Sequence, residues 1–137
     1  MSIFSSASVE QLNASSKGTL AEALGIEITE IGSDFVRGRM PVDRRTLQPY
    51  GLLHGGASVA LAETLGSIGG ALAAGGAQVV GLEINANHMR GKRDGWVTGT
   101  ARPMHLGRTT QVWEIRIEDD TQALVCVSRL TLAVKRG

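Results

Sequence analysis

One long stretch of the sequence carries almost no charge. From Gly55 to Ala77 the only charged side chain is Glu63, and small and apolar residues follow one another without a period of two. We therefore predict a long helix over residues 57–74 that is apolar nearly all round. Such a helix must be enclosed by other elements rather than lie on a surface.

About 20 apolar residues also suffice to cross a bilayer. This stretch, however, is rich in Gly and Ala rather than Leu and Ile, has a carboxylate near its middle, and lies between segments with strand periodicity. These features favour a buried helix of a soluble domain over a transmembrane helix.

Segments on both sides of this helix alternate with the period of β-strands. Before it, Ile26 and Ile28 share a face, and a turn at residues 32–34 leads to a second strand through Val42, which predicts a hairpin. After it, apolar residues alternate again, and we expect Val80, Leu82, Ile84 and Ala86 to share one face. The later strands are predicted at residues 80–86, 96–102, 113–117 and 124–134, with loops at 91–95 and 103–108.

The N-terminal region has less pattern. Residues 1–17 are Ser-rich and are interpreted as a lead-in segment, whereas Thr19 begins a short helix that Gly25 ends. We predict an α+β fold, with one domain over residues 1–137 in which an antiparallel β-sheet wraps around a long central α-helix.

Composition limits the classes of function. Charged residues make up 20% of the chain and the formal net charge is +1, so no broad basic field favours nucleic acid or an anionic membrane. The single cysteine, Cys126, lies in an apolar strand and is interpreted as a small buried hydrophobe. The sequence has no CxxC or metal-ligand cluster, and its first residues do not resemble a secretory signal, so we expect a cytoplasmic protein without a metal.

The lone carboxylate of the apolar helix is the strongest candidate for chemistry. Burying an ionised group costs several kcal/mol unless it is paired or hydrogen-bonded. Glu63 is therefore either a satisfied structural carboxylate or a catalytic base or nucleophile. Ser67 follows four residues later, on the same helix face, where it could help to hold a water or a substrate atom.

His54 cannot join Glu63 in a site built from one chain. Nine residues separate them, which puts them on opposite helix faces and about 13 Å apart along the axis if both are helical. Either His54 is an isolated residue at the start of the helix, or a two-fold dimer brings it to Glu63 of a second subunit.

Two glycines, Gly55 and Gly56, open the predicted helix. A helix N-terminus presents free N–H groups with a partial positive charge, so a carbonyl oxygen placed there would be polarised. The same glycines could equally serve only for tight packing, and the sequence leaves both explanations open.

Four segments of the sequence resemble a known family. They are QPYGLLHGGA at 48–57, AETLGS at 62–67, EINANH at 83–88 and PMHLGR at 103–108. Together they are similar to the PaaI-like branch of the hotdog-fold acyl-CoA thioesterases, and the likeness extends over nearly the whole chain. The resemblance implies the hotdog fold and hydrolysis of a thioester, with a site built across a dimer interface.

The resemblance also implies roles for five residues. Glu63 would be the nucleophile or the general base, and the Gly55 amide would polarise the thioester carbonyl. Gln48 and His54 would hold the thioester and its leaving sulfur, and Ser67 would position the water. Contacts with the substrate and CoA are implied for Leu82, His88, Met89, Arg90, Gly91, His105, Leu106, Gly107 and Arg108.

Cations near these segments could bind the phosphates of CoA. Arg90 and Arg108 match family positions, and Lys92 and Arg93 lie beside them, although all four could instead be solvated charges of turns. One position departs from the family, because relatives often have a second histidine where this chain has Met89.

The resemblance favours an aromatic acyl-CoA, such as a hydroxybenzoyl or dihydroxynaphthoyl thioester, hydrolysed without a cofactor. One alternative is a proofreading enzyme that acts on acyl groups attached to the phosphopantetheine arm of a carrier protein. Another is a hotdog protein that binds acyl-CoA without catalysis. We expect a homotetramer formed by two dimers.

Overall fold

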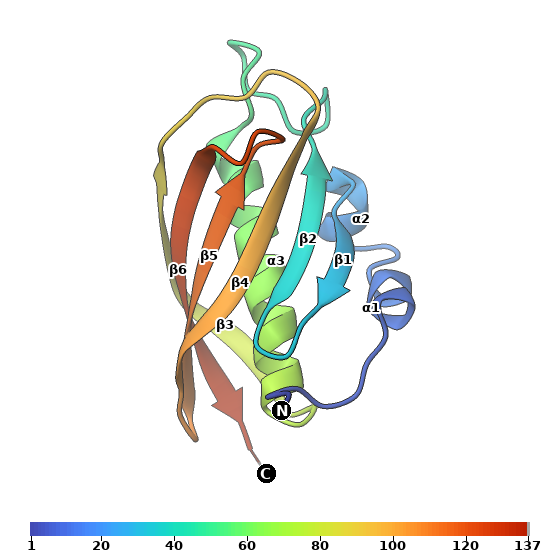
Figure 1. Cartoon of the computed structure of the whole chain (residues 1–137), viewed down its shortest axis with the longest axis vertical. Helices are drawn as coiled ribbons and strands as arrows, with labels where there is room; N and C mark the ends of the chain where they lie inside the picture. The colour runs from blue at the N-terminus through green and yellow to red at the C-terminus, as the bar shows by residue number, and fades with distance from the viewer. Residues whose placement is uncertain (137) are drawn as a thin grey trace.

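The long helix predicted from the uncharged stretch is α3 (Gly55–Ala73), and a six-stranded antiparallel sheet wraps around it (Figure 1). The structure is a computed structural model, and it describes residues 1–136. The predicted α+β architecture is confirmed. The other elements are α1 (Val9–Ser15), α2 (Leu20–Leu24), β1 (Glu27–Ile31), β2 (Val36–Pro41), β3 (Gln78–His88), β4 (Trp96–Leu106), β5 (Thr110–Glu118) and β6 (Leu124–Lys135).

Glycines allow α3 to approach the sheet closely. A Cβ atom on Gly66 would lie 2.6 Å from the Leu130 side chain, and one on Gly69 would lie 2.7 Å from the Trp113 ring. Trp113 is completely buried, and its indole N–H donates to Gln111 Oε1 at 2.9 Å. The helix backbone therefore packs directly on side chains of β5 and β6. By length and by its mean hydropathy of 1.2 alone, α3 would also qualify as a candidate membrane span.

The buried face of the sheet forms one core with α3. Leu61 and Leu65 of the helix are fully buried, as are Ile115 of β5 and Cys126 of β6. Burial raises the pKa of the Cys126 thiol, which agrees with its predicted place as a buried hydrophobe.

The N-terminal segment contains a helix that the sequence analysis missed. Ser8 Oγ accepts the N–H of Gln11 at 3.1 Å, and Gln11 Oε1 accepts the N–H of Ser8 at 3.0 Å, which is a capping box at the start of α1. Thr19 precedes α2 as predicted, but its hydroxyl donates to the carbonyl of Ser16 at 2.6 Å and does not cap the helix.

Two β-bulges make the observed strands differ from the predicted ones. The segment 103–108, predicted as a loop, is mostly strand, because β4 continues to Leu106 through a register shift next to Pro103. In β3 a register shift between Gly81 and Glu83 breaks the predicted alternation. Val80 and Leu82 are consequently exposed, whereas Ile84 packs against the core.

The sheet order β1-β2-β4-β5-β6-β3 leaves β1 and β3 as edge strands. The side chain of Asn13 in α1 covers part of the β1 edge, since its Nδ2 donates to Ile28 O at 3.0 Å and its Oδ1 accepts the Ile28 N–H at 2.8 Å. The β3 edge carries the exposed side chains of Val80 and Leu82. Of the two edges, β3 is therefore the more open to pairing with another strand.

The close contact between α3 and the sheet predicts the effect of filling a glycine. Gly69→Ala should lower the free energy of unfolding by about 1–3 kcal/mol, because the added methyl group overlaps the buried Trp113 ring. Helix propensity alone would predict a gain of about 1 kcal/mol, so the sign separates the two effects. Urea denaturation measures it. The loss should shrink in a Trp113→Leu background, and a more stable Gly69→Ala single variant would contradict the packing argument.

Candidate active site

The loop before α3 is held in a fixed shape by backbone hydrogen bonds. The N–H of His54 donates to Thr46 O, and the N–H of Leu53 donates to Lys92 O, both at 2.7 Å. Leu47 forms an isolated bridge with Leu53. Thr46 is buried, and its hydroxyl donates to Pro41 O at 2.8 Å. The residues of this loop are thus positioned by β2 and by the β3–β4 connection.

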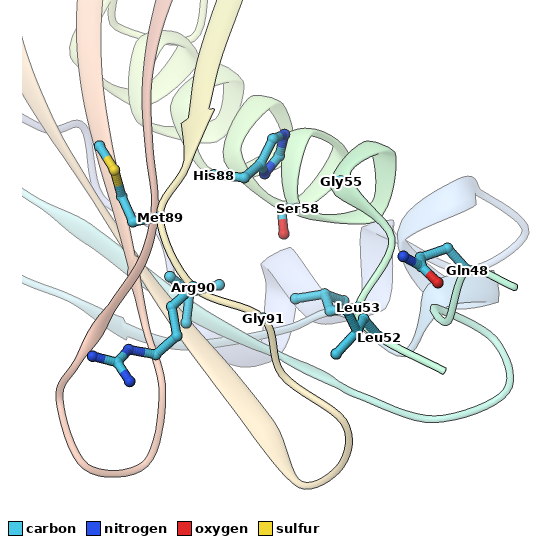
Figure 2. Close-up of a pocket in the computed structure, with 10 residues that line it drawn as sticks. Gln48, Leu52, Leu53, Gly55, Ser58, His88, Met89, Arg90 and Gly91 are labelled. Carbon is cyan, nitrogen blue, oxygen red and sulfur yellow. The ribbon is translucent and has the colours of Figure 1, made fainter. Parts of the chain in front are cut away.

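The amide of Gln48 is oriented by its own loop. Gln48 Oε1 accepts the N–H of Tyr50, so the Nε2 group is the end that can donate to a ligand. Gln48 lines a cavity of about 310 Å³, and Figure 2 shows its nitrogen on the cavity side of the side chain. The loop therefore presents a hydrogen-bond donor at this cavity.

His54 is the N-cap of α3. Its Nδ1 accepts the N–H of Gly56 at 2.7 Å, so Nε2 carries the proton when the ring is neutral. The carbonyl of His54 accepts the N–H groups of Ala57 and Ser58 at 3.0 and 3.2 Å. Of the four N–H groups at the start of the helix, only that of Gly55 lacks a hydrogen-bond partner within residues 1–136.

Gly55, whose N–H is open, lines the same cavity. The His88 ring lies so close that a Cβ on Gly55 would be 2.9 Å from His88 Nε2. Gly55 is therefore needed for close packing, and it also presents the one free donor of the helix N-terminus. Both explanations that the sequence leaves open, tight packing and a free donor, are compatible with this geometry. The cavity is lined by Gln48, Leu52, Leu53, Gly55, Ser58, His88, Met89, Arg90, Gly91 and Val125.

Glu63 and Ser67 share a different cavity of about 360 Å³, between α3 and the segment that joins α1 to α2. Glu63 is half-buried, and within residues 1–136 no hydrogen bond or ion pair involves its carboxylate. Its Oε2 lies against Gly81 of β3, where a Cβ would collide with it. The alternative of a carboxylate satisfied by a partner inside the chain is therefore not supported.

The structure does not bring all the candidates together. Eight residues of helix, roughly 12 Å along the axis, separate Gly55 from Glu63. The segment 105–108 lies at the opposite end of the sheet from Arg90, because Arg108 O accepts from Arg136 Nε at 2.9 Å, beyond the end of β6. His88 instead pairs with Cys126 near the start of β6. One chain thus carries three separate groups of candidates, and Leu82 is exposed beside Gly81.

The cations of the β3–β4 connection differ in their contacts. Lys92 Nζ pairs with Asp120 Oδ1 at 3.0 Å, and this hydrogen bond raises the pKa of Lys92. Arg93 Nη1 donates to Tyr50 O at 3.3 Å. Both side chains therefore hold loops together, whereas Arg90 is exposed and forms no ion pair within the described residues. Arg90 is the cation of this group that is available to a ligand.

Sequence reasoning missed one polar residue of the first cavity. Ser58 is buried on α3, and its hydroxyl points into the cavity in Figure 2. The signal was present, because Ser58 is a polar residue in the apolar helix, three positions after Gly55 and therefore on the same face.

Comparison with known proteins gives consistent matches. Residues 50–126 match the Thioesterase superfamily. The chain is 56% identical to the proofreading thioesterase EntH of Cronobacter turicensis over 127 residues, which cover 92% of this chain and 93% of that protein. It is 54% identical to the 1,4-dihydroxy-2-naphthoyl-CoA hydrolase of Escherichia coli over 127 residues, which again cover 92% of this chain and 93% of that protein. A crystal structure of the Haemophilus influenzae thioesterase HI1161 superposes with a TM-score of 0.95 at 50% identity, covering 98% of this chain and 95% of that one.

The cap made by His54 predicts a difference between two substitutions. His54→Ala should lower the free energy of unfolding by about 1 kcal/mol, because the N–H of Gly56 loses its acceptor. His54→Asn should keep most of the stability, since the Asn oxygen can accept the same N–H. Thermal denaturation of the two variants beside the wild type measures this. Equal stability of both variants would mean that the imidazole does not act as a cap.

Proposed function

Because the chain belongs to the Thioesterase superfamily, we propose that it hydrolyses an aromatic acyl-CoA, of the hydroxybenzoyl or dihydroxynaphthoyl type, to the free acid and CoA. The family, the hotdog fold and thioester hydrolysis, which the sequence motifs implied, are confirmed by the matches. The aromatic acyl group is supported by the name of the Escherichia coli relative, which acts on a bicyclic aromatic thioester. We expect the enzyme to act in the cytoplasm.

The observation that carries the mechanism is Glu63, a carboxylate without a hydrogen-bond or ion-pair partner among residues 1–136, on an otherwise apolar helix. In the proposed reaction the thioester carbonyl accepts the free N–H of Gly55, and Gln48 Nε2 donates to the thioester. Glu63 then either attacks the carbonyl carbon, which forms an anhydride and releases the CoA thiolate, or removes a proton from the attacking water. Ser67 would hold that water. Both routes consume one water and yield the acid and the thiol.

In the proposed site these groups come from two subunits, because roughly 12 Å of helix separates Gly55 from Glu63 within one chain. Two-fold antiparallel pairing of β3 with its copy, centred near Ile84 and Asn85, would put Gly81 of one chain beside His88 of the partner subunit. Glu63 lies against Gly81, and Gly55 lies against His88, so this pairing would join the two halves of the site. The capped β1 edge and the exposed β3 edge support this choice of interface.

A tetramer would account for the third group of candidates. His105, Leu106, Gly107 and Arg108 lie at the end of the sheet remote from the first cavity, so they could reach a bound CoA only from another subunit. A dimer of dimers would supply them, and Met104 and Leu106 are exposed apolar side chains that a second dimer could cover.

Action on a carrier-bound acyl group is the second candidate. It is favoured by the proofreading thioesterase of Cronobacter turicensis, which is as similar to this chain as the CoA hydrolase. The chemistry at Glu63 would be the same, and only the molecule that carries the phosphopantetheine arm would differ. Binding of acyl-CoA without catalysis is less well supported, because binding alone would not require the carboxylate of Glu63.

Removal of the carboxylate tests the proposed chemistry. Glu63→Ala and Glu63→Gln should each lower kcat by about 10²- to 10⁴-fold, because neither side chain can attack the thioester or accept a proton. Steady-state hydrolysis with detection of the free thiol measures this on benzoyl-, hydroxynaphthoyl- and fatty acyl-CoA, and on one benzoyl group carried by a carrier protein.

The relative rates on these thioesters also distinguish the candidate substrates. Preference for the aromatic CoA thioesters supports the proposal, and a faster rate on the carrier-bound group favours proofreading. If folded Glu63→Ala keeps the wild-type rate, Glu63 is a structural carboxylate and the mechanism is wrong.

Mixing two inactive variants tests the shared site. Glu63→Ala and Gln48→Ala would each damage both sites of a homodimer, but a mixed dimer would contain one site with both residues intact. After subunit exchange, the equimolar mixture should regain about a quarter of the wild-type activity. Each variant exchanged with itself is the control. Failure to regain activity, with exchange demonstrated by mass labelling, would show that the two residues act within one chain.

A further inference from the structure

The Ser58 side chain of α3 faces the cavity at the start of the helix. It is 1% exposed, yet its Oγ forms no hydrogen bond within residues 1–136 and points into the cavity at the start of α3 (Figure 2). A hydroxyl at a cavity can hydrogen-bond water while the cavity is open, but it needs another partner once a ligand displaces that water. A bound ligand is one way to supply the missing partner.

The usual intrahelical partner of this hydroxyl is already occupied. A serine in a helix commonly donates to the carbonyl four residues earlier, which here belongs to His54. That carbonyl accepts the N–H groups of Ala57 and Ser58. The hydroxyl is therefore left directed at the cavity, where it can donate one hydrogen bond and accept another.

The position of Ser58 in the cavity indicates which part of a ligand it meets. In Figure 2 Ser58 lies between Gln48 on one side and Arg90 on the other, and Leu52 and Leu53 line the space beside it. Gln48 and Gly55 are the proposed contacts of the thioester, and Arg90 is the exposed cation suited to phosphate. The segment that connects a thioester to a phosphate in acyl-CoA has two pairs of methylene groups and two amides, followed by a short branched unit that carries one hydroxyl.

We propose that the Ser58 hydroxyl hydrogen-bonds an amide of the phosphopantetheine arm and thereby positions the thioester at Gly55. The inference rests on the proposed function for the direction in which the ligand lies. The apolar side chains of Leu52, Leu53 and Val125 suit the methylene groups, and Ser58 is the hydroxyl among them. CoA and a carrier protein present the same arm, so the contact serves both.

The test compares thioesters with and without the arm. Ser58→Ala should lower kcat/KM for benzoyl-CoA about threefold to tenfold, mainly through KM, as expected for the loss of one neutral hydrogen bond. It should leave the hydrolysis of S-ethyl thiobenzoate, which has no amide, unchanged. Benzoyl groups on CoA and on a holo carrier protein should be affected alike; a loss with only one of them identifies the source of the arm.

Binding of free CoA provides a readout that does not require catalysis. Calorimetry should give a Kd that is threefold to tenfold weaker for Ser58→Ala, while its melting temperature stays the same or rises. The matched control is Ser128→Ala, because Ser128 Oγ is a buried hydroxyl without a hydrogen bond in residues 1–136 and belongs to β6, outside this cavity. Ser128→Ala should leave the Kd for CoA unchanged.

The results that overturn the inference are distinct from those that overturn the proposed function. An unchanged Kd for CoA, or an equal loss of rate on benzoyl-CoA and on S-ethyl thiobenzoate, shows that the hydroxyl does not bind the arm. If the wild type hydrolyses none of these thioesters but the Kd for CoA still depends on Ser58, the proposed hydrolysis is wrong and the contact stands.

Discussion

An apolar helix is stable in a small protein only where other elements cover it, and this requirement organises the whole chain. The sheet wraps around α3, and the missing side chains of Gly66 and Gly69 let the helix backbone rest on Leu130 and Trp113. The sheet leaves one face of α3 to other partners. That face carries Glu63, which lines a cavity with residues of α2 and of the segment before it, and whose Oε2 lies against Gly81 of the edge strand β3. The part of the helix that the sheet does not bury is thus the part available for chemistry.

At the N-terminus of α3 most of the N–H donors are already hydrogen-bonded, and this determines which donor a ligand can use. An ordinary helix start offers four free N–H groups. Here Thr46 O accepts the N–H of His54, and the ring and carbonyl of His54 accept those of Gly56 and Ala57, so among the described residues only the N–H of Gly55 is left. Gln48 is constrained in the same way, since the N–H of Tyr50 fixes its amide with Nε2 as the donor. Preorganised donors of this kind need no rearrangement when negative charge develops on a carbonyl oxygen.

Much of this architecture could be predicted from the sequence because long-range periodicity reports burial directly. The apolar helix, the strands and the separation of His54 from Glu63 all follow from spacing. The failures came from local features. The capping box of Ser8 and Gln11 is a short signal, the bulge in β3 turns Val80 and Leu82 away from the core, and the bulge in β4 lets the strand continue into the predicted loop. The remote position of Arg108 depends on strand order, and the unpartnered hydroxyl of Ser58 depends on hydrogen bonds that only the fold reveals.

Assembly and catalysis are linked by the position of Glu63. In the single chain the carboxylate is half-buried on a face of α3 next to an edge strand, where water can still reach it. Pairing of two β3 strands would cover this region and exclude water from it. The same step would bring the carboxylate to the donors at Gly55 and Gln48, where a lower effective dielectric strengthens their interaction with a thioester oxygen. An isolated subunit would then lack both half of the reacting groups and the environment in which they act. On this account the exposed β3 edge is the element that connects folding with activity, and the capped β1 edge directs association to it.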